Sequence, residues 1–339
     1  MAALPGVPFL RACSDIFLTL PRNDSMSKFA FVFPGQGSQA IGMLNGLADN
    51  AVVRETLAEA SDVLQFDMTE LITHGPKEAL DLTTNTQPVM LTASVAIYRA
   101  WRAAGGAAPD FVAGHSLGEY AALVAADAIS FRAALPLVRF RAEAMQQAVP
   151  VGQGAMAAIL GLADAEVQAV CEEASQGDVV EAVNFNAPAQ VVIAGTKAAV
   201  DRACLIAKEK GAKRALLLPV SAPFHSSLLQ PASDRLRGYL DTVTVCAPQI
   251  ALINNVDVAS PIEPLAIKDA LVRQAASPVR WVETVQALAA RGATCVIECG
   301  PGKVLAGLTR RIVPDVTSAA MFDQASIDAT LALVAGVRA

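Results

Sequence analysis

The sequence predicts an α/β fold in which a large layered domain with a mostly parallel sheet carries a small inserted domain. Short apolar runs alternate with helix-like segments over most of the 339 residues, which is the order of elements in an α/β layered sheet. Between about residues 152 and 220 the order becomes β-α-β-β-α-β, that of a ferredoxin-like unit. We expect the large domain to comprise residues 26–150 and 222–339, and the small domain residues 151–221.

The first half of the large domain is expected to contain two strands. Residues 29–33 form an apolar run typical of a buried parallel strand, and residues 111–114 form a second run before a tight turn. The helix near residue 86 has a threonine cap and a proline in its first turn. Helix-like segments lie at residues 52–64, 86–101, 117–126 and 130–147.

The remaining elements follow the same two patterns. Strands of the small domain are expected at residues 156–160, 179–184, 190–194 and 214–220, and its helices at residues 163–174 and 197–210. Beyond it, strands are expected at residues 250–253 and 294–298, and helices at 264–275, 281–290 and up to 312, before a last strand and helix.

The stretch Phe111-Val-Ala-Gly-His-Ser-Leu-Gly-Glu-Tyr120 carries the strongest chemical signal. Ser116 lies between Gly114 and Gly118 at the expected strand-to-helix turn, which is the nucleophile-elbow pattern. The turn is so tight that side chains two residues either side of the serine would collide with it. The following helix points its N–H groups and its positive dipole end at any charge that forms near the hydroxyl. The pattern predicts that Ser116 is a nucleophile.

A serine nucleophile needs a neighbouring base, and the chain has three histidines. His74 has the context of a surface turn. His115 adjoins Ser116, and neighbouring side chains at a strand end point to opposite sides. His225 lies where the small domain rejoins the large one, and sites form in clefts between domains. Elimination therefore favours His225 as the base.

No acid between Ser116 and His225 has the setting of a third catalytic group. Asp178 and Asp201 belong to the small domain's own loops and helices, whereas an α/β-hydrolase carries this acid between its serine and histidine. The mismatch weakens an ordinary esterase interpretation. A backbone carbonyl is an alternative partner for the imidazole.

Composition excludes several other classes. The net charge of −6 and the lack of a basic stripe argue against nucleic acid as a partner, and no apolar run reaches membrane-span length. Six scattered cysteines without a CxxC pair predict reduced thiols in the cytoplasm, not disulfides or a zinc site. Residues 1–25 are expected to be a poorly ordered extension.

The loop at Gly35-x-Gly37-x-x-Ala40 formally matches a dinucleotide-binding fingerprint. That fingerprint requires a second strand ending in an acid about 20 residues on, but residues 52–64 have a helical pattern. The other use of such a loop is to bring backbone N–H groups close to an anion.

Four motifs together resemble one family. These motifs are Gly35-Gln-Gly-Ser-Gln39, Gly114-His-Ser-Leu-Gly-Glu-Tyr120, Phe224-His225 and Glu298-Cys-Gly-Pro-Gly-Lys303. With them the chain resembles the malonyl-CoA:acyl carrier protein transacylases of type II fatty acid synthesis, and is similar to polyketide synthase acyltransferase domains, from about residue 29 to 311. The resemblance implies a hydrolase-like large domain with an inserted ferredoxin-like domain, malonyl-CoA and acyl carrier protein as partners, and no cofactor or metal.

The resemblance also implies a role for individual residues. Ser116 would carry the malonyl ester and His225 would be its base, held by a carbonyl of Gln274. Gln36 and Leu117 would donate backbone N–H groups to the oxyanion.

Two further residues would contact substrate. Arg141 would bind the free malonyl carboxylate through parallel hydrogen bonds, and Asn186 would face the substrate channel from the small domain. The alternative for Arg141 is an exposed position on its helix, which is the role expected for Arg139. The alternative for Asn186 is a turn residue at the end of a strand. Phe224 resembles the malonyl-selecting branch. Docking of an acidic carrier protein would use a basic patch at Lys208, Lys210, Lys213 and Arg214, or at Arg310 and Arg311.

Three rival functions remain at this point. A serine thioesterase or esterase would hydrolyse malonyl-CoA without a carrier protein. A carrier-protein docking module with an inactive site would not become labelled by radiolabelled malonyl-CoA. A dinucleotide-binding oxidoreductase would bind its cofactor in a titration.

Overall fold

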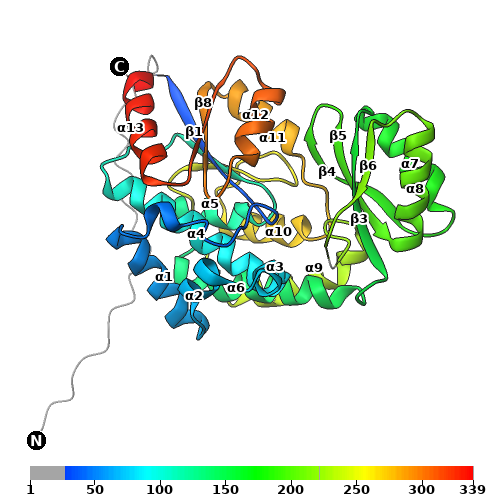
Figure 1. Cartoon of the computed structure of the whole chain (residues 1–339), viewed down its shortest axis with the longest axis horizontal. Helices are drawn as coiled ribbons and strands as arrows, with labels where there is room; N and C mark the ends of the chain where they lie inside the picture. Colours follow the sequence, from blue (N-terminus) through cyan, green and yellow to red (C-terminus); the bar gives the residue numbers. More distant parts are fainter. Residues whose placement is uncertain (1–26, 221, 339) are drawn as a thin grey trace, which may run out of the picture.

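The computed structural model describes residues 27–220 and 222–338, which form two sheets with flanking helices (Figure 1). The expected extension at residues 1–25 lies outside the described residues. Among the described helices, none is long and apolar enough to cross a membrane.

The larger sheet has five strands in the order β7-β2-β1-β8-β9, and every neighbouring pair is parallel. The central strand β1 is buried along its length except at its first residue. Its alternate side chains enter two cores, because Phe29, Phe31 and Phe33 join one cluster and Ala30 and Val32 join the other. The strands are β1 (Lys28–Phe33), β2 (Phe111–Gly114), β7 (Ala251–Ile253), β8 (Ala293–Cys299) and β9 (Thr317–Met321).

Helices cover the faces of this sheet (Figure 1). The helices are α1 (Ala51–Leu64), α2 (Met68–His74), α3 (Lys77–Asp81), α4 (Thr83–Ala103), α5 (Gly118–Ala125), α6 (Phe131–Ala148), α9 (Gln230–Asp241), α10 (Pro264–Gln274), α11 (Trp281–Ala290), α12 (Val304–Ile312) and α13 (Gln324–Arg338), with short 3₁₀ turns at Asn45–Leu47 and Ser227–Leu229. The helix at α1 also removes the second strand that a dinucleotide fold would need.

The start of α4 corrects one detail of the prediction. The helix begins at Thr83, so Thr86 is not its cap. The Thr86 hydroxyl instead donates to the carbonyl of Leu80 at 2.6 Å, and Pro88 lies inside the helix. Thr86 is buried, and its hydroxyl satisfies a carbonyl of the preceding segment rather than an N–H of its own helix.

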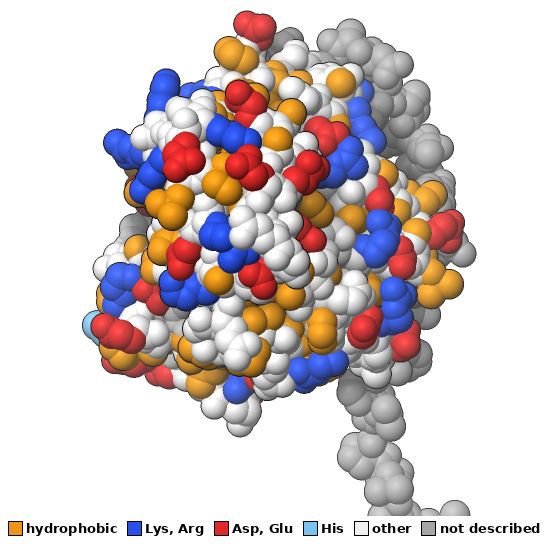
Figure 2. Space-filling model, turned by 90° about the vertical axis from the view of Figure 1, so that its right-hand side faces the viewer, with side chains coloured by type: hydrophobic (Ala, Val, Ile, Leu, Met, Phe, Trp, Pro, Cys, Tyr) orange, Lys and Arg blue, Asp and Glu red, His pale blue; other side chains and the backbone are white. Residues whose placement is uncertain are grey.

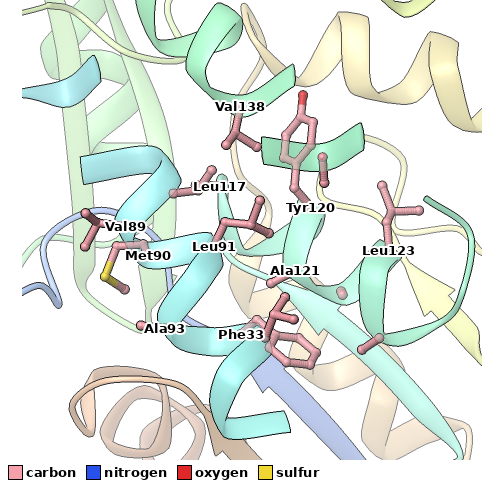
Figure 3. Packing of buried hydrophobic residues seen from close by; sticks show 14 of the residues in the cluster. Phe33, Val89, Met90, Leu91, Ala93, Leu117, Tyr120, Ala121, Leu123 and Val138 are labelled. Carbon is pink, nitrogen blue, oxygen red and sulfur yellow. The ribbon is translucent and has the colours of Figure 1, made fainter. Parts of the chain in front are cut away.

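The turn between β2 and α5 rests on a dense apolar core. Figure 3 shows Leu91 of α4, Val138 of α6 and Leu117 and Tyr120 at the start of α5 packed together. Each of these side chains is at most 1% exposed. Full burial of a leucine or valine contributes about 1.5–3 kcal/mol, so this core holds the turn firmly in place.

The smaller sheet is antiparallel, in the order β4-β5-β3-β6. Along the chain its elements follow the predicted β-α-β-β-α-β order, and the predicted fold class is confirmed. They are β3 (Gly154–Leu160), α7 (Asp164–Ser175), β4 (Val180–Ala187), β5 (Gln190–Thr196), α8 (Lys197–Glu209) and β6 (Arg214–Leu217). Strand β6 is shorter than the expected 214–220. The domain boundaries at residues 151 and 221 stay a prediction.

The outer edge of β4 contacts the large domain through main-chain hydrogen bonds. The amide of Phe185 donates to the carbonyl of Val279 at 3.1 Å, and the amide of Val279 donates to that of Val183 at 2.8 Å. These bonds form a parallel bridge between Asn184 and Val279.

The cysteines follow the sequence expectation only in part. Cys171, Cys204, Cys295 and Cys299 are free and buried, whereas Cys246 is disulfide-bonded. The expectation of reduced thiols is therefore wrong for Cys246. Spacing along a chain cannot reveal such a bond, because disulfide pairing depends on distances in space.

Candidate active site

The elbow has the tight geometry that the glycine spacing predicts. Ser116 has a φ of 52°, a strained value for a residue other than glycine. A Cβ on Gly114 would lie 1.9 Å from the carbonyl carbon of Gly118, and one on Gly118 would lie 2.0 Å from the carbonyl oxygen of Phe33. Only glycine fits at either position, so strand, serine and helix can approach this closely.

Ser116 and His225 are in hydrogen-bond contact. The serine Oγ lies 2.7 Å from His225 Nε2, and His225 Nδ1 lies 2.9 Å from the backbone oxygen of Gln274. Gln274 is the last residue of α10, where helix carbonyls lack intrahelical partners. With Nδ1–H donating to that carbonyl, Nε2 is left to accept the serine proton.

The environment of His225 keeps its ring neutral. Burial and then the positive charge of Arg141 lower the pKa of His225 to about 3. A neutral imidazole is the form that accepts a proton from a hydroxyl.

Arg141 lies beside Ser116 and is 2% exposed. Its Nη1 donates to Gln87 Oε1 and its Nη2 to Gln274 Oε1, both at 2.9 Å. A longer contact of 3.3 Å joins Nη2 to Ser116 Oγ. An exposed helix position is therefore wrong for Arg141 and right for Arg139, whose side chain pairs with Glu143 on the outside of α6.

Hydrogen bonds leave part of the Arg141 guanidinium available. Three of its five N–H donors point to Gln87, Gln274 and Ser116. Within the described part of the chain, its Nε donor has no partner. A buried cation with spare donors beside a nucleophile favours a substrate that carries an anionic group.

Gln36 and Leu117 line the same cavity as Ser116. Among residues 27–220 and 222–338, neither backbone amide donates to a protein acceptor. A Cβ on Gly35 would lie 2.5 Å from the carbonyl oxygen of His115, so glycine lets this loop lie against the elbow. The arrangement supports the expected oxyanion role of both amides.

The other two histidines form hydrogen bonds with residues other than Ser116. His115 Nε2 contacts Asn186 Oδ1 at 2.8 Å, and its ring meets Trp281 edge-on. Burial lowers the pKa of His115. His74 ends α2, is exposed and pairs with Glu70. Asn186 thus lines the cavity and contacts the elbow through His115, and its role toward the substrate stays a prediction.

Sequence reasoning missed Glu119 and Asn255. Glu119 Oε2 accepts from Gln274 Nε2 and from the amide of Asn255, both at 2.9 Å. Asn255 follows β7, the strand next to β2, and parallel strands bring their carboxyl ends to one edge. A carboxylate in an apolar helix three residues after Ser116 was the available signal. Burial raises the pKa of Glu119 to about 7.

A cavity of about 560 Å³ joins these groups. Its polar lining includes Gln36, His115, Ser116, Arg141, Asn186 and His225, and its apolar lining includes Leu117, Met145, Met156, Val192 and Phe224. Gln274 supports this cavity from behind through His225 and Arg141. The arrangement can form and cleave an ester on Ser116 and can hold a small acyl group with a negative end.

The chain matches one family over nearly its whole length. The sequence model of the acyl transferase domain family matches residues 30–328. The malonyl CoA-acyl carrier protein transacylase of Escherichia coli (strain K12) is 53% identical over 309 residues, 91% of this chain and 100% of the relative. That of Bacillus subtilis (strain 168) is 45% identical over 305 residues, 89% and 96% of the two chains.

Solved structures agree with this match. An acyl-carrier-protein S-malonyltransferase from Burkholderia pseudomallei 1710b is 71% identical, with a TM-score of 0.89 over 90% of this chain and 99% of that one. A malonyl-transacylase in complex with a type II PKS acyl-carrier protein is 51% identical, with a TM-score of 0.90 over 91% and 100%. Sequence, fold and the meeting of Ser116, His225 and Arg141 agree, and the chain belongs to the malonyl CoA-acyl carrier protein transacylase family.

Proposed function

We propose that this protein is an acyltransferase that moves a malonyl group from malonyl-CoA to the phosphopantetheine thiol of acyl carrier protein. The product would supply fatty acid or polyketide chain extension. One observation carries the proposal: Ser116 Oγ lies 2.7 Å from a neutral imidazole and 3.3 Å from a buried guanidinium. The first contact activates a nucleophile, and the second selects an acyl group with a carboxylate.

The first half-reaction loads the serine. His225 Nε2 takes the Ser116 proton while Oγ bonds to the thioester carbon, and the carbonyl oxygen becomes an oxyanion. The free amides of Gln36 and Leu117 stabilise this charge. The carbon–sulfur bond then breaks, His225 returns the proton to the departing CoA thiolate, and a malonyl ester remains on Ser116.

The second half-reaction reverses these roles. His225 takes the proton of the carrier thiol, whose sulfur attacks the ester carbon. Ser116 Oγ leaves and recovers a proton from His225. Gln274 holds the imidazole in one tautomer throughout, because its carbonyl accepts only from a protonated Nδ1.

Arg141 explains why malonyl would be preferred over acetyl. The malonyl carboxylate would pair with the guanidinium, whereas acetyl-CoA would leave that buried charge without an anion. Sites built around hydrogen bonds reject analogues that lack the bonding group by roughly 10⁴-fold. Phe224 lines the cavity beside His225, and its bulk supports selection of a small acyl group.

Acid-stable labelling tests the proposal. Incubation with radiolabelled malonyl-CoA is expected to label the wild-type chain, to leave Ser116→Ala unlabelled, and to release the label when acyl carrier protein is added. Label persisting on Ser116→Ala would refute the assignment. Rapid hydrolysis of malonyl-CoA without a carrier protein would favour a thioesterase instead.

The carrier-protein contact remains a prediction. Figure 2 shows the small-domain side of the molecule with basic and acidic side chains interspersed. Lys210 in the expected basic patch pairs with Glu173 at 2.6 Å. Arg311 in the other patch donates to the carbonyl of Pro188. Charge reversal at Lys208, Lys213 and Arg214 is expected to slow transfer to the carrier protein and to leave self-acylation by malonyl-CoA unchanged.

We also propose a cytoplasmic location. Four free buried thiols support it, since disulfides are rare in the cytosol, and the bond at Cys246 points the other way. Fractionation of cells that produce the protein would test this location.

A further inference from the structure

A buried polar network lies beneath the nucleophile, and one carboxylate joins its parts. Glu119 is 2% exposed, and its neighbours Gln274 and Asn255 are 0% exposed. Burying a carboxylate is costly unless hydrogen bonds compensate for lost water. The expected transfer chemistry uses Gln274 and Arg141 but gives Glu119 no part.

The side-chain amide of Gln274 lies between two groups of opposite charge. Its Nε2 donates to Glu119 Oε2 at 2.9 Å and to the backbone oxygen of Ser116 at 3.0 Å. Its Oε1 accepts from Arg141 Nη2 at 2.9 Å. An amide nitrogen can only donate and an amide oxygen can only accept. The carboxylate and the guanidinium therefore fix which end of the amide faces which way.

The same carboxylate oxygen also supports the elbow. Glu119 Oε2 accepts from the amide of Asn255 at 2.9 Å. The side chain of Asn255 accepts from the amide of Ser116 and donates to the carbonyl of Gly114, both at 2.7 Å. Asn255 follows strand β7, so these bonds fix the strained backbone of Ser116 to the end of the neighbouring strand.

Ser116, Arg141 and His225 are therefore all connected to one oxygen atom, Glu119 Oε2. Glu119 places Ser116 through Asn255. Through the Gln274 side chain it places Arg141, and holding that residue also places the Gln274 carbonyl that binds His225.

We propose that Glu119 is a positioning residue that fixes Gln274 and Asn255, and through them the relative placement of Ser116, His225 and Arg141. The inference rests on the proposed malonyl transfer. It predicts that Glu119 acts by accepting hydrogen bonds, so an uncharged oxygen at the same place serves almost as well.

The test compares Glu119→Ala with Glu119→Gln. Single-turnover acylation by malonyl-CoA and by acetyl-CoA is measured for each, along with the thermal midpoint. Glu119→Ala is expected to slow malonyl acylation by about 100-fold, the order expected for a displacement of about 1 Å, and to slow acetyl acylation less. Glu119→Gln, which keeps an acceptor oxygen, is expected to recover most of the malonyl rate.

Glu298→Ala is the matched control. Glu298 is 0% exposed, and its Oε2 accepts from the amide of Ala306 at 2.8 Å, at the start of α12. Its loss is expected to lower the thermal midpoint without changing the ratio of malonyl to acetyl acylation. A change of stability alone therefore cannot imitate the effect expected at Glu119.

Wild-type rates in a folded Glu119→Ala, or equal losses in the Ala and Gln variants, would overturn the inference. If Glu119→Ala does not fold, Glu119→Asp carries the test, because it keeps the charge but withdraws the oxygens by one methylene. The same preferential loss of malonyl acylation is expected there, and wild-type rates would refute it. Failure of the wild-type chain to take label from malonyl-CoA would instead refute the proposed function.

Discussion

Replacing Arg141 with alanine tests the proposed contact between the site and the carboxylate of the acyl group. The variant removes a guanidinium that is 2% exposed and that donates to Gln87 and Gln274. Those two bonds support acylation by any substrate, so the rate with acetyl-CoA measures their loss. The ratio of malonyl to acetyl acylation then reports the carboxylate contact alone.

The size of the change follows from the charges involved. A hydrogen bond to a charged group contributes about 1.5–3 kcal/mol. Two such bonds between the guanidinium and a malonyl carboxylate would contribute about 3–6 kcal/mol, a factor of about 10² to 10⁴ in relative rate. Salt would screen this pair little because the group is buried.

The assay is single-turnover labelling of Ser116 with malonyl-CoA and acetyl-CoA at equal concentrations. The malonyl-to-acetyl ratio is expected to fall at least about 100-fold in Arg141→Ala. Arg139→Ala is the matched control, since this arginine lies on the same helix but outside the cavity, paired with Glu143. A ratio that stays within about threefold of wild type, a change of less than 1 kcal/mol, would show that Arg141 does not read the carboxylate.

Three further predictions concern pH and packing. Because the pKa of His225 is lowered to about 3, its ring stays neutral well below pH 6.5. The acid limb of the acylation rate is expected far below that value, and a midpoint near 6.5 would contradict a buried neutral base. The Glu298 pKa is raised from 4.5 to about 7, chiefly by burial. Its protonated form therefore favours folding, and this stability is present below pH 4.5 and lost as the pH rises through 7. Glu298→Gln should flatten that slope in denaturant titrations, and an unchanged slope would refute the assignment. Gly114→Ala would place a Cβ 1.9 Å from the backbone of Gly118 and should lower the free energy of unfolding by more than about 3 kcal/mol. A free energy of unfolding equal to that of the wild type would show that the elbow can relax.

The sequence pattern predicted the elbow because its glycine spacing is a recognisable signature. The clash that requires Gly114 lies within the motif, at Gly118, whereas the one that requires Gly118 is with the distant Phe33 carbonyl. Ser116 and His225 could be paired because the chain offers few histidines and only one at the return from the small domain. The partner of His225 is the backbone carbonyl of Gln274. The missing acid suggested a carbonyl, but no residue type marks one, so only the family resemblance pointed to Gln274. Asn255 was missed because its contacts with the elbow join residues far apart in sequence.

Local signals also failed where the fold overruled them. Thr86 has the sequence context of a helix cap, yet the helix begins at Thr83. The Thr86 hydroxyl donates instead to the carbonyl of Leu80. The end of β6 at Leu217 similarly depends on where its partner β3 stops pairing, which apolar content does not reveal.

The bridge between Asn184 and Val279 restricts how reactants enter and leave. Because main-chain bonds at 2.8 and 3.1 Å join strand β4 of the small domain to Val279 of the large domain, a rotation that separates the two domains would break them. We therefore expect the cavity to keep its width during turnover and the pantetheine arm to enter between side chains. The same bridge also covers the free edge of β4, which could otherwise pair with a strand of another molecule.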